Sequence, residues 1–343
     1  MCSAVVTCDC TIVVGGRHET SSSPPKKLLH LVAGATALSS IPRSARGQAY
    51  PTRPVRIIVG FPAGGSPDIV ARLIGQWLSE RLGQRFVIDD RPGATSSIAT
   101  EAVVRAPPDG YTLLLVTSAN PIVTALYQRL RFDFIRDIAP VASIVRAPLV
   151  MVVHPSVPPR TVPEFIAYAK ANPGKINYAS PGIGSTNHVA GELFKMMAGV
   201  EMVHVPYRTS PVPDLLAGQV QVMFVNLPPS IDYIRADKLR ALAVSTATRS
   251  TALPDTPAIS EFLRGYEASS WYGIGAPRDT PVGIIQRLNT VINAALVSPV
   301  MQMRLADLGG IVYPISPADF GMLIADETEK WGKVIRAANI KAE

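Results

Sequence analysis

Continuous apolar runs alternate with stretches of helical periodicity from Tyr50 to the end of the chain. The run "VRIIVGF" at 55–61 precedes apolar positions with i, i+3, i+4, i+7 spacing at 67–82, and "TLLLVT" follows at 112–117. A second series of such runs begins near 148–154. Apolar strands separated by helices are typical of a parallel sheet that helices cover on both faces. The pattern therefore predicts an α/β protein with two lobes, each a mostly parallel sheet flanked by helices.

The same pattern predicts the individual elements. Strands are expected at 55–61, 85–89, 112–117, 148–154, 176–180, 200–207, 220–226, 239–245 and 269–276. Helices are expected near 67–82, 96–105, 162–171, 185–198, 281–297, 299–308 and 317–338, with a short one near Asp214.

The net charge of +7 raises the question of a nucleic-acid partner. Residues 1–49 hold five of the 33 basic residues and two of the 26 acidic ones, so the rest of the chain carries only a small excess of basic residues. Past residue 49 there is no long block of like charge and no basic stripe with interleaved aromatic residues. We therefore expect no nucleic-acid partner.

All three cysteines (Cys2, Cys8 and Cys10) lie in the first segment, so no disulfide or thiol chemistry is expected beyond it. The Cys8-x-Cys10 pair lacks the second pair that a zinc site needs, and no metal site is expected.

The first 49 residues have the organisation of an export signal. Lys26 and Lys27 form a positive start, Leu28 to Ile41 is apolar but too short to span a bilayer, and Gly47 and Ala49 place small residues where a signal peptidase reads. An amphipathic first helix is the alternative. Because no later run reaches 18 apolar residues, we expect a periplasmic protein that is not membrane-embedded, with cleavage after Ala49. Residues 1–25 do not show this organisation, and they are consistent with translation from an upstream start codon.

A glycine turn, "VGFPAGGSPD" at 59–68, joins the first strand to the first helix. Gly64 and Gly65 can adopt a positive φ and allow a ligand to approach the backbone closely. Ser66 is a natural N-cap. A helix N-terminus of this kind binds anions through its free N–H groups. The Walker and the dinucleotide-binding glycine patterns are both absent. An anion site and a purely structural turn both remain open on this stretch alone.

A second turn of the same type is "YASPGIGSTNHVAGELF" at 178–194, where Gly182 and Gly184 precede Ser185 and Thr186. Two such turns, one in each predicted lobe, can aim two helix N-termini into one cleft, which suits a ligand with carboxylates at one or both ends. A second ordinary capping turn is the alternative. His188 lies one turn into this helix and is either a polar ligand contact or a packing residue.

Catalytic motifs are missing. The sequence has no G-x-S-x-G elbow and no H-E-x-x-H motif, and His154, His188 and His204 show no metal-ligand spacing. No catalytic residue and no cofactor is therefore expected.

A string of motifs in order resembles the receptors of tripartite tricarboxylate transporters, the Bug (TctC-like) family of periplasmic solute-binding proteins. The motifs are "YPTRPVRIIVGFPAGGSPDIVARL", "DDRPGA", "PDGYTLLL", "ANPGKINYASPGIGSTNHVAGELF", "HVPYR", "DLLAGQVQVMF", "LRALAVS", "LPDTPAISE", "SSWYGIGAP" and "TPVGIIQRLN". They extend from Tyr50 nearly to the C-terminus.

The resemblance implies a type II periplasmic-binding-protein fold, with the ligand cleft between two lobes. Lobe 1 is expected at 50–152 plus 274–323, and lobe 2 at 153–273 plus 324–343. The implied ligand is a small organic carboxylate and the implied partner a two-component membrane permease of the tripartite tricarboxylate type. We expect a monomer.

The resemblance also implies which residues bind the ligand. They lie on five loops after predicted strands: Phe61, Ala63, Gly64, Gly65, Ser66 and Asp68; Thr117, Ser118 and Asn120; Ser180, Gly182, Gly184, Ser185, Thr186 and His188; Tyr207 and Arg208; Val225 and Asn226.

Several positions depart from the family's pattern. Pro67 stands where the family usually has Ser or Thr, and it removes an N–H donor. The glycine-rich run expected after Ala94 reads "TSSIAT", and the loop before Asp214 is about two residues short by this comparison. Val225 replaces a typical Asp, an acceptor for a ligand amino group. This last change favours a carboxylate without an amino group.

Three functions remain open at this stage. The first is a receptor that binds, closes and does no chemistry. The second is a transferase or lyase on the same fold, which would need an acid/base pair for which Asp68 and His188 are the candidates. The third is a ligand-loaded sensor for a signalling system.

Overall fold

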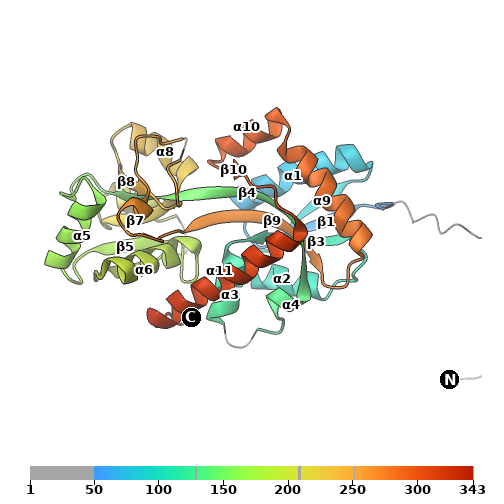
Figure 1. The fold of residues 1–343 in the computed structure, drawn as a ribbon, viewed down its shortest axis with the longest axis horizontal. Coiled ribbons are helices and arrows are strands. Elements are labelled where there is room, and N and C mark those ends of the chain that lie inside the picture. The colour runs from blue at the N-terminus through green and yellow to red at the C-terminus, as the bar shows by residue number, and fades with distance from the viewer. Residues whose placement is uncertain (1–49, 128–129, 208–209, 251, 343) are drawn as a thin grey trace, which may run out of the picture. The chain divides into compact units, whose positions relative to one another are not determined.

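The structure is a computed structural model that describes residues 50–127, 130–207, 210–250 and 252–342 (Figure 1). The predicted export signal with its cysteines, and Arg208 of the predicted site, lie outside the described residues.

A first sheet contains the N-terminal strands. Its order is β2 (Phe86–Asp90), β1 (Val55–Val59), β3 (Thr112–Thr117), β9 (Ser269–Pro277) and β4 (Ile138–Val153), and the short β10 (Ile311–Val312) also pairs with β4. β1 is parallel to β2 and β3, whereas β9 is antiparallel to both β3 and β4.

A second sheet continues from the far end of β4. It contains β7 (Val222–Asn226), β5 (Asn177–Ser180) and β6 (Val203–Pro206), and β8 (Arg240–Val244) pairs with β4 beside them. β5 is parallel to β6 and β7, whereas β4 is antiparallel to β7 and β8. Within β4 the residues up to Pro148 pair with β9, and those from Leu149 pair with β7, so one long strand belongs to both sheets (Figure 1).

Helices cover both faces of the first sheet. One face carries α1 (Ser66–Leu82), α9 (Val282–Leu296) and α10 (Pro299–Asp307). The other face carries α2 (Ser97–Val104) with the 3-10 turn η1 (Ala94–Ser96), α4 (Phe134–Asp137) and the beginning of α11 (Pro317–Ala337).

The second sheet is covered in the same way. The end of α11, α3 (Ala119–Leu126), α5 (Val162–Ala171) and α6 (Thr186–Ala198) pack on one face, together with the 3-10 turn η2 (Ile259–Glu261). The other face is covered by α7 (Val212–Leu216) and α8 (Leu227–Arg235).

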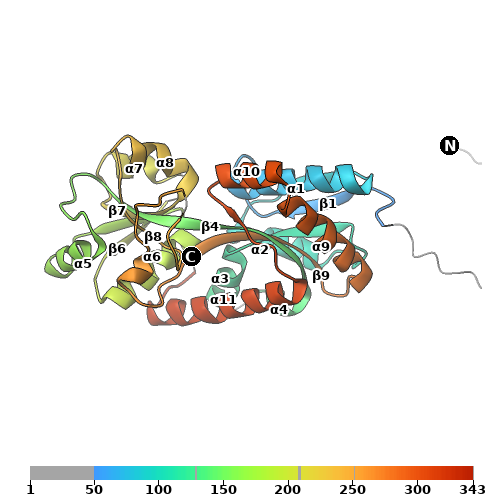
Figure 2. The same cartoon turned by 45° about the horizontal axis from the view of Figure 1, so that its top comes forward.

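Helix α11 joins the two cores (Figure 2). Its Phe320 and Ile324 are buried against the first sheet, and its Trp331 and Val334 are buried against the second. Such burial contributes roughly 2 kcal/mol for each large apolar side chain. The helix therefore links both sheets.

The α/β fold and most predicted elements are confirmed, but the pattern does not reveal α3, α4, α8 and β10, or the true start of β4. β4 contains Pro140 and Pro148, which normally argue against an internal strand. The register shifts at a bulge between Pro140 and Ala142, and Pro148 lies where the partner of the strand changes from β9 to β7. The lobe boundaries at 50–152 plus 274–323 and at 153–273 plus 324–343 stay a prediction.

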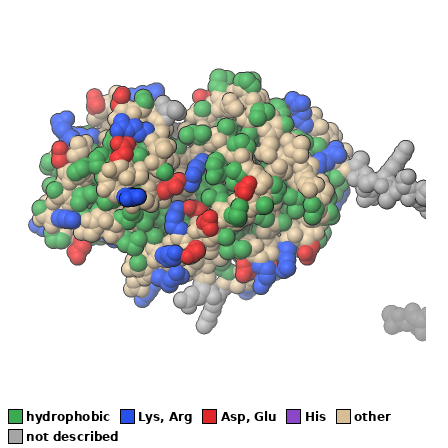
Figure 3. All heavy atoms as spheres, viewed as in Figure 1, with side chains coloured by type: hydrophobic (Ala, Val, Ile, Leu, Met, Phe, Trp, Pro, Cys, Tyr) green, Lys and Arg blue, Asp and Glu red, His purple; other side chains and the backbone are tan. Residues whose placement is uncertain are grey.

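None of the helices in the described ranges is both long and apolar enough to pass through a bilayer. On the face shown in Figure 3, acidic and basic side chains are interspersed and no large area carries a single sign.

Candidate functional site

Loops that follow four strands meet around a cavity of about 400 Å³. These loops follow β1, β3, β5 and β7 and lead into α1, α3, α6 and α8, so four helix N-termini lie around it. Ligands of α/β sheets commonly bind at the carboxyl ends of strands. The lining residues are Phe61, Pro62, Ser66, Pro67, Thr95, Thr117, Ser118, Ala119, Pro181, Gly182, Ile183, Ser185, Thr186, Asn187, Asn226, Ser270 and Tyr272.

A second, more open hollow of about 670 Å³ adjoins this cavity and shares Phe61, Pro181 and Asn226 with it. The hollow adds the glycine turn at 63–65 and Val225, among other residues, to the lining. The cavity and the hollow together form the cleft.

The first glycine turn opens α1 toward the cleft. Gly64 has a φ of +82°, and Gly65 is the extended N-cap of the helix. Ser66 begins the helix, while Pro67 provides no N–H. Among the described residues, no protein group accepts a hydrogen bond from the backbone N–H of Gly65 or Ser66. These groups are the expected anion donors at a helix N-terminus.

Asp68 serves the turn itself. Its Oδ2 accepts a 2.7 Å hydrogen bond from the Gly64 N–H, and its Oδ1 lies 2.7 Å from Arg72 Nε. Burial acts to raise the pKa of Asp68, but the hydrogen bonds from Arg72 and Gly64 outweigh it and leave the pKa below its ordinary value. Arg72 also contacts Asp90, at 3.1 Å. Asp68 and Arg72 are therefore both paired with other groups of the protein.

The second turn is held by serine hydroxyls. Ser185 is the N-cap of α6: its Oγ accepts from the His188 N–H at 3.2 Å and donates to the Gly182 carbonyl at 2.8 Å. Ser180 Oγ also donates to that carbonyl, at 3.1 Å, and accepts from the Gly182 N–H. Gly182 and Gly184 have φ values of +126° and +78°, which favour glycine.

Two stacked histidines lie behind this turn, with ring centroids 3.8 Å apart. His188 Nδ1 accepts from the Gly184 N–H at 3.2 Å, and His204 Nε2 shares a 2.7 Å hydrogen bond with Ser180 Oγ. Burial, followed by the charge of Lys195, lowers the pKa of His188 to about 4, and burial together with its stacked neighbour lowers that of His204 to about 3. Both rings are therefore neutral at pH 7, and they support the turn from behind.

The loop after β3 connects the two sheets. Asn120 is buried and holds the loop from inside, because its Oδ1 accepts from the Thr117 N–H at 2.7 Å. Ser118 Oγ lies 2.9 Å from Thr186 Oγ1 at the start of α6. This hydrogen bond spans the cleft from the first sheet to the second.

The end of β7 provides an amide. Asn226 Oδ1 accepts from Ser270 Oγ at 3.2 Å, and both residues line the cavity. Val225 lines the hollow with an apolar side chain.

Tyr207 lines neither the cavity nor the hollow, and its hydroxyl donates a 2.7 Å hydrogen bond to Asp214. Burial and the Asp214 carboxylate raise the pKa of Tyr207 to about 12.

The cavity is lined by both polar and apolar groups, and no charged side chain is among its described lining residues. Its donors are hydroxyls, side-chain amides and backbone N–H groups at helix N-termini, whose dipoles favour negative charge. Burial raises the pKa of Tyr272 to about 12, so its hydroxyl remains a donor at neutral pH. The arrangement is suited to a small anion, and no acidic side chain among the described lining residues could pair with a ligand cation.

Most of the predicted residues are brought together. Those that line the cavity or the hollow are Phe61, Ala63, Gly64, Gly65, Ser66, Thr117, Ser118, Gly182, Ser185, Thr186, Val225 and Asn226. Those that lie behind it are Asp68, Asn120, Ser180, Gly184, His188 and Tyr207.

Other lining residues were not predicted, among them Thr95, Asn187, Ser270 and Tyr272. Ser270 and Tyr272 lie in the motif "SSWYGIGAP", which is a detectable signal. Thr95 begins the stretch "TSSIAT", whose departure from the family's glycine-rich run is a signal that was noted but not connected with the ligand.

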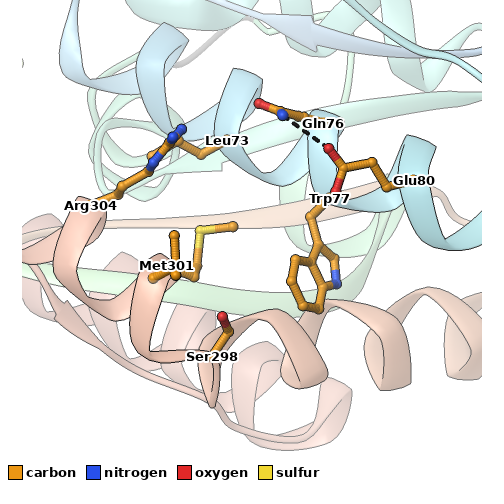
Figure 4. Close-up of a pocket in the computed structure, with 8 residues that line it drawn as sticks. Leu73, Gln76, Trp77, Glu80, Ser298, Met301 and Arg304 are labelled. Carbon is orange, nitrogen blue, oxygen red and sulfur yellow. Dashed lines mark hydrogen bonds between the residues drawn. The ribbon is translucent and has the colours of Figure 1, made fainter.

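A groove away from these loops lies between α1 and α10 (Figure 4). It has a volume of about 260 Å³ and is lined by apolar side chains such as Leu73 and Met301, beside a 2.9 Å hydrogen bond from Gln76 to Glu80. No predicted ligand residue lines it. Within the described ranges, no three His, Cys, Asp or Glu side chains are grouped so that they could hold a metal ion.

Related sequences share this organisation. The family model described as "Tripartite tricarboxylate transporter family receptor" matches residues 70–340. A "UPF0065 protein in tcbD-tcbE intergenic region" of Pseudomonas sp. (strain P51) is 37% identical over 314 residues, covering 90% of this chain and 93% of that protein. Protein BugT of Bordetella pertussis is 35% identical over 322 residues, covering 92% and 98%.

Solved structures are similar as well. Rpa4515 of R. palustris, determined with adipate, has a TM-score of 0.77 and 39% identity, covering 85% of this chain and 99% of that one. MatC (Rpa3494) of Rhodopseudomonas palustris, with bound malate, has a TM-score of 0.74 and 30% identity, covering 83% and 100%. The fold, the ordered motifs and the family match agree: this chain belongs to the receptor family of the tripartite tricarboxylate transporters.

Proposed function

We propose that this protein is a periplasmic receptor that holds a small organic carboxylate in the cleft and delivers it to a two-component permease of the tripartite tricarboxylate type. The observation that carries the proposal is the cavity itself, where helix N-termini and hydroxyls converge and no charged side chain is among the described lining residues. The adipate and malate in the titles of two similar structures support the same ligand class.

The receptor function is favoured over an enzyme on this fold. The two acid/base candidates are occupied, since Asp68 accepts from Gly64 and contacts Arg72, and His188 accepts from Gly184. Neither lines the cavity. A binding site that holds its ligand through neutral donors needs no such pair.

The ligand lacks an amino group under this proposal. Val225 presents an apolar side chain to the hollow, and no acidic side chain lines the described part of the cleft. An ammonium group placed there would lose its hydration without gaining a carboxylate partner, which is costly.

A thermal-shift series tests ligand class. Malate, adipate and benzoate are compared with aspartate and glutamate, and the carboxylates without an amino group should raise the unfolding midpoint. Binding stabilises the native state by about 2.7 kcal/mol at a hundredfold excess over Kd. A shift with the amino acids alone contradicts the absence of an ammonium site, and turnover of any bound acid contradicts the receptor function.

The Gly65→Val variant tests the first turn. Gly65 has an ordinary φ of −78°, and an added Cβ would come no closer than 3.5 Å to another residue, so the fold should tolerate Val. Its branched side chain should cover the adjacent Ser66 N–H and abolish the ligand-induced shift. Gly283→Val is the matched control, because a Cβ there has nothing within 4 Å and the residue does not line the cleft. An unchanged shift in Gly65→Val dismisses this turn as a ligand site.

Export and assembly are tested on the secreted protein. Mass spectrometry of periplasmic material should show a mature chain that begins at Tyr50, and light scattering should give the mass of a monomer.

Deleting the gene should abolish uptake of the carboxylate that gives the largest thermal shift. Intact uptake with loss of induction would instead support a sensor.

A further inference from the structure

Three consecutive non-glycine residues have a left-handed backbone at the junction of β2 and α2. Ala94, Thr95 and Ser96 have φ values of 44°, 49° and 75°. L-residues avoid this region because Cβ approaches the following carbonyl oxygen, and for a β-branched residue such as Thr95 the conformation is an outlier. Glycine would adopt it without strain.

The surrounding contacts hold this segment in place. The Ser96 N–H donates to the Gly93 carbonyl at 3.1 Å, and Thr100 Oγ1 donates to the Ser96 carbonyl at 2.9 Å. Ser96 is fully buried against Gly60, where a Cβ would lie 2.1 Å from Ser96 Oγ. The strained backbone is therefore fixed by its neighbours and is not a loose turn.

Only Thr95 of the three residues lines the cavity. Ala94 is exposed and Ser96 is buried behind the wall, whereas Thr95 is half-buried and borders the cavity with Ser66 and Tyr272. A glycine at 95 would relieve the strain and remove the side chain from the cavity. Strain that the surroundings maintain is typical of functional sites.

We propose that Thr95 is a specificity-determining residue whose left-handed backbone presents its side chain to the cleft, where its bulk limits the length of the carboxylate that fits. This assignment rests on the proposed carboxylate-binding function. Thr95 follows β2 of the first sheet, and it lines the cavity together with Gly182 and Ser185 of the second glycine turn. Removing it lengthens the space available to the ligand.

The test uses the unbranched dicarboxylates from succinate to suberate as probes, with Kd measured by calorimetry on the full mature chain. Thr95→Gly should weaken binding of the acid that wild type prefers by about tenfold, the scale expected when a pocket no longer fits its ligand closely. Its preference should move to a longer acid. Thr95→Val, which keeps the shape of threonine, should retain the wild-type ranking.

Ala94→Gly is the matched control, because it relieves the same kind of strain one residue away without changing the cavity. Both glycine variants should raise the ligand-free unfolding midpoint, by about 2–4 °C. Only Thr95→Gly should change the ranking of acids.

Each outcome bears on a distinct claim. A wild-type protein that binds none of the probes or other carboxylates contradicts the proposed function and this assignment with it. A wild type that binds, with an identical ranking in Thr95→Gly, contradicts the assignment alone. A ranking that changes equally in Ala94→Gly or in Thr95→Val also overturns it, because length selection would then not come from the bulk of this side chain.

Discussion

The His188 imidazole supports the second glycine turn only while it is neutral. His188 Nδ1 accepts the Gly184 N–H, and a protonated ring has no acceptor. The groups that face the pair are Lys195, which opposes its protonation, and Glu192, whose carboxylate lies 3.9 Å from His188 Nε2 and also accepts from the Tyr178 hydroxyl. The second glycine turn is therefore linked to the charge state of a buried pair.

Stability should fall as the pH drops from about 6.5 toward 4. In that range the unfolded chain takes up protons at histidines whose native pKa values are lowered to about 4 and about 3, so the unfolded state binds more protons. His188 alone should cost about 3 kcal/mol over this range. Urea unfolding between about pH 7 and 4.5 measures the slope, which His204→Phe should reduce because it removes one of the two titrating groups.

The carboxylate of Asp137 contributes mainly below this range. The hydrogen bond from Arg136 holds the pKa of Asp137 at about 2, so its contribution is present above about pH 4 and is lost only at lower pH. Equal slopes for wild type and His204→Phe would contradict the role of the pair.

The roles of individual residues in the candidate site were harder to predict than the loops that line it. The turns that contain Gly65 and Ser185 were predicted, since strand, glycine and cap residues are local signals. Asp68 and His188 lie on the same turns, yet their side chains bind the protein's own backbone. That choice depends on loop conformation, which spacing along the chain does not reveal. Thr95 enters the cavity lining through a backbone conformation that propensity disfavours.

The strand β9 illustrates how tightly the elements of the first sheet are packed. It lies between β3 and β4, and Phe320 of α11 packs over Gly273. The sequence pattern predicted this strand but not its antiparallel direction, because the apolar run is the same in either direction. The length of β4 was missed because its prolines argue against a continuous strand, and the bulge beside Pro140 arises only from pairing with β9.

Gly273→Ala should destabilise the protein by about 3 kcal/mol. An added Cβ would lie 2.6 Å from the Ala142 carbonyl oxygen and 2.3 Å from Phe320 Cζ, and the backbone oxygen is held in the sheet. Gly283→Ala, in the first turn of α9, should instead stabilise by about 0.5 kcal/mol, since nothing lies within 4 Å of its Cβ. The midpoints of urea unfolding measure both changes in stability. A Gly273→Ala variant as stable as the wild type would mean that β4 and β9 can separate locally.

For the molecule as a whole, the cleft is assembled from loops that are distant in the chain. Ordered motifs predicted the family, and with it the fold and the loops that meet. They did not show which side chains touch across the cleft, because no local pattern relates Ser118 to Thr186. Their 2.9 Å hydrogen bond joins the N-cap of α3 to the first residue of α6.

We expect this bond to couple ligand binding to the approach of the two sheets. Ser118→Ala and Thr186→Val should each weaken binding about fivefold, the loss of roughly 1 kcal/mol for one hydrogen bond. The double variant should lose little more than either single variant, because the same bond is removed in both. Calorimetry with the acid that gives the largest thermal shift measures binding by the wild type, the two single variants and the double variant.

Ser270→Ala with Thr186→Val is the control pair. Ser270 lines the same cavity but bonds to Asn226, so these two losses of binding free energy should add. Additive losses for Ser118 and Thr186 would mean that each hydroxyl acts on the ligand alone and that the cleft closes without this contact.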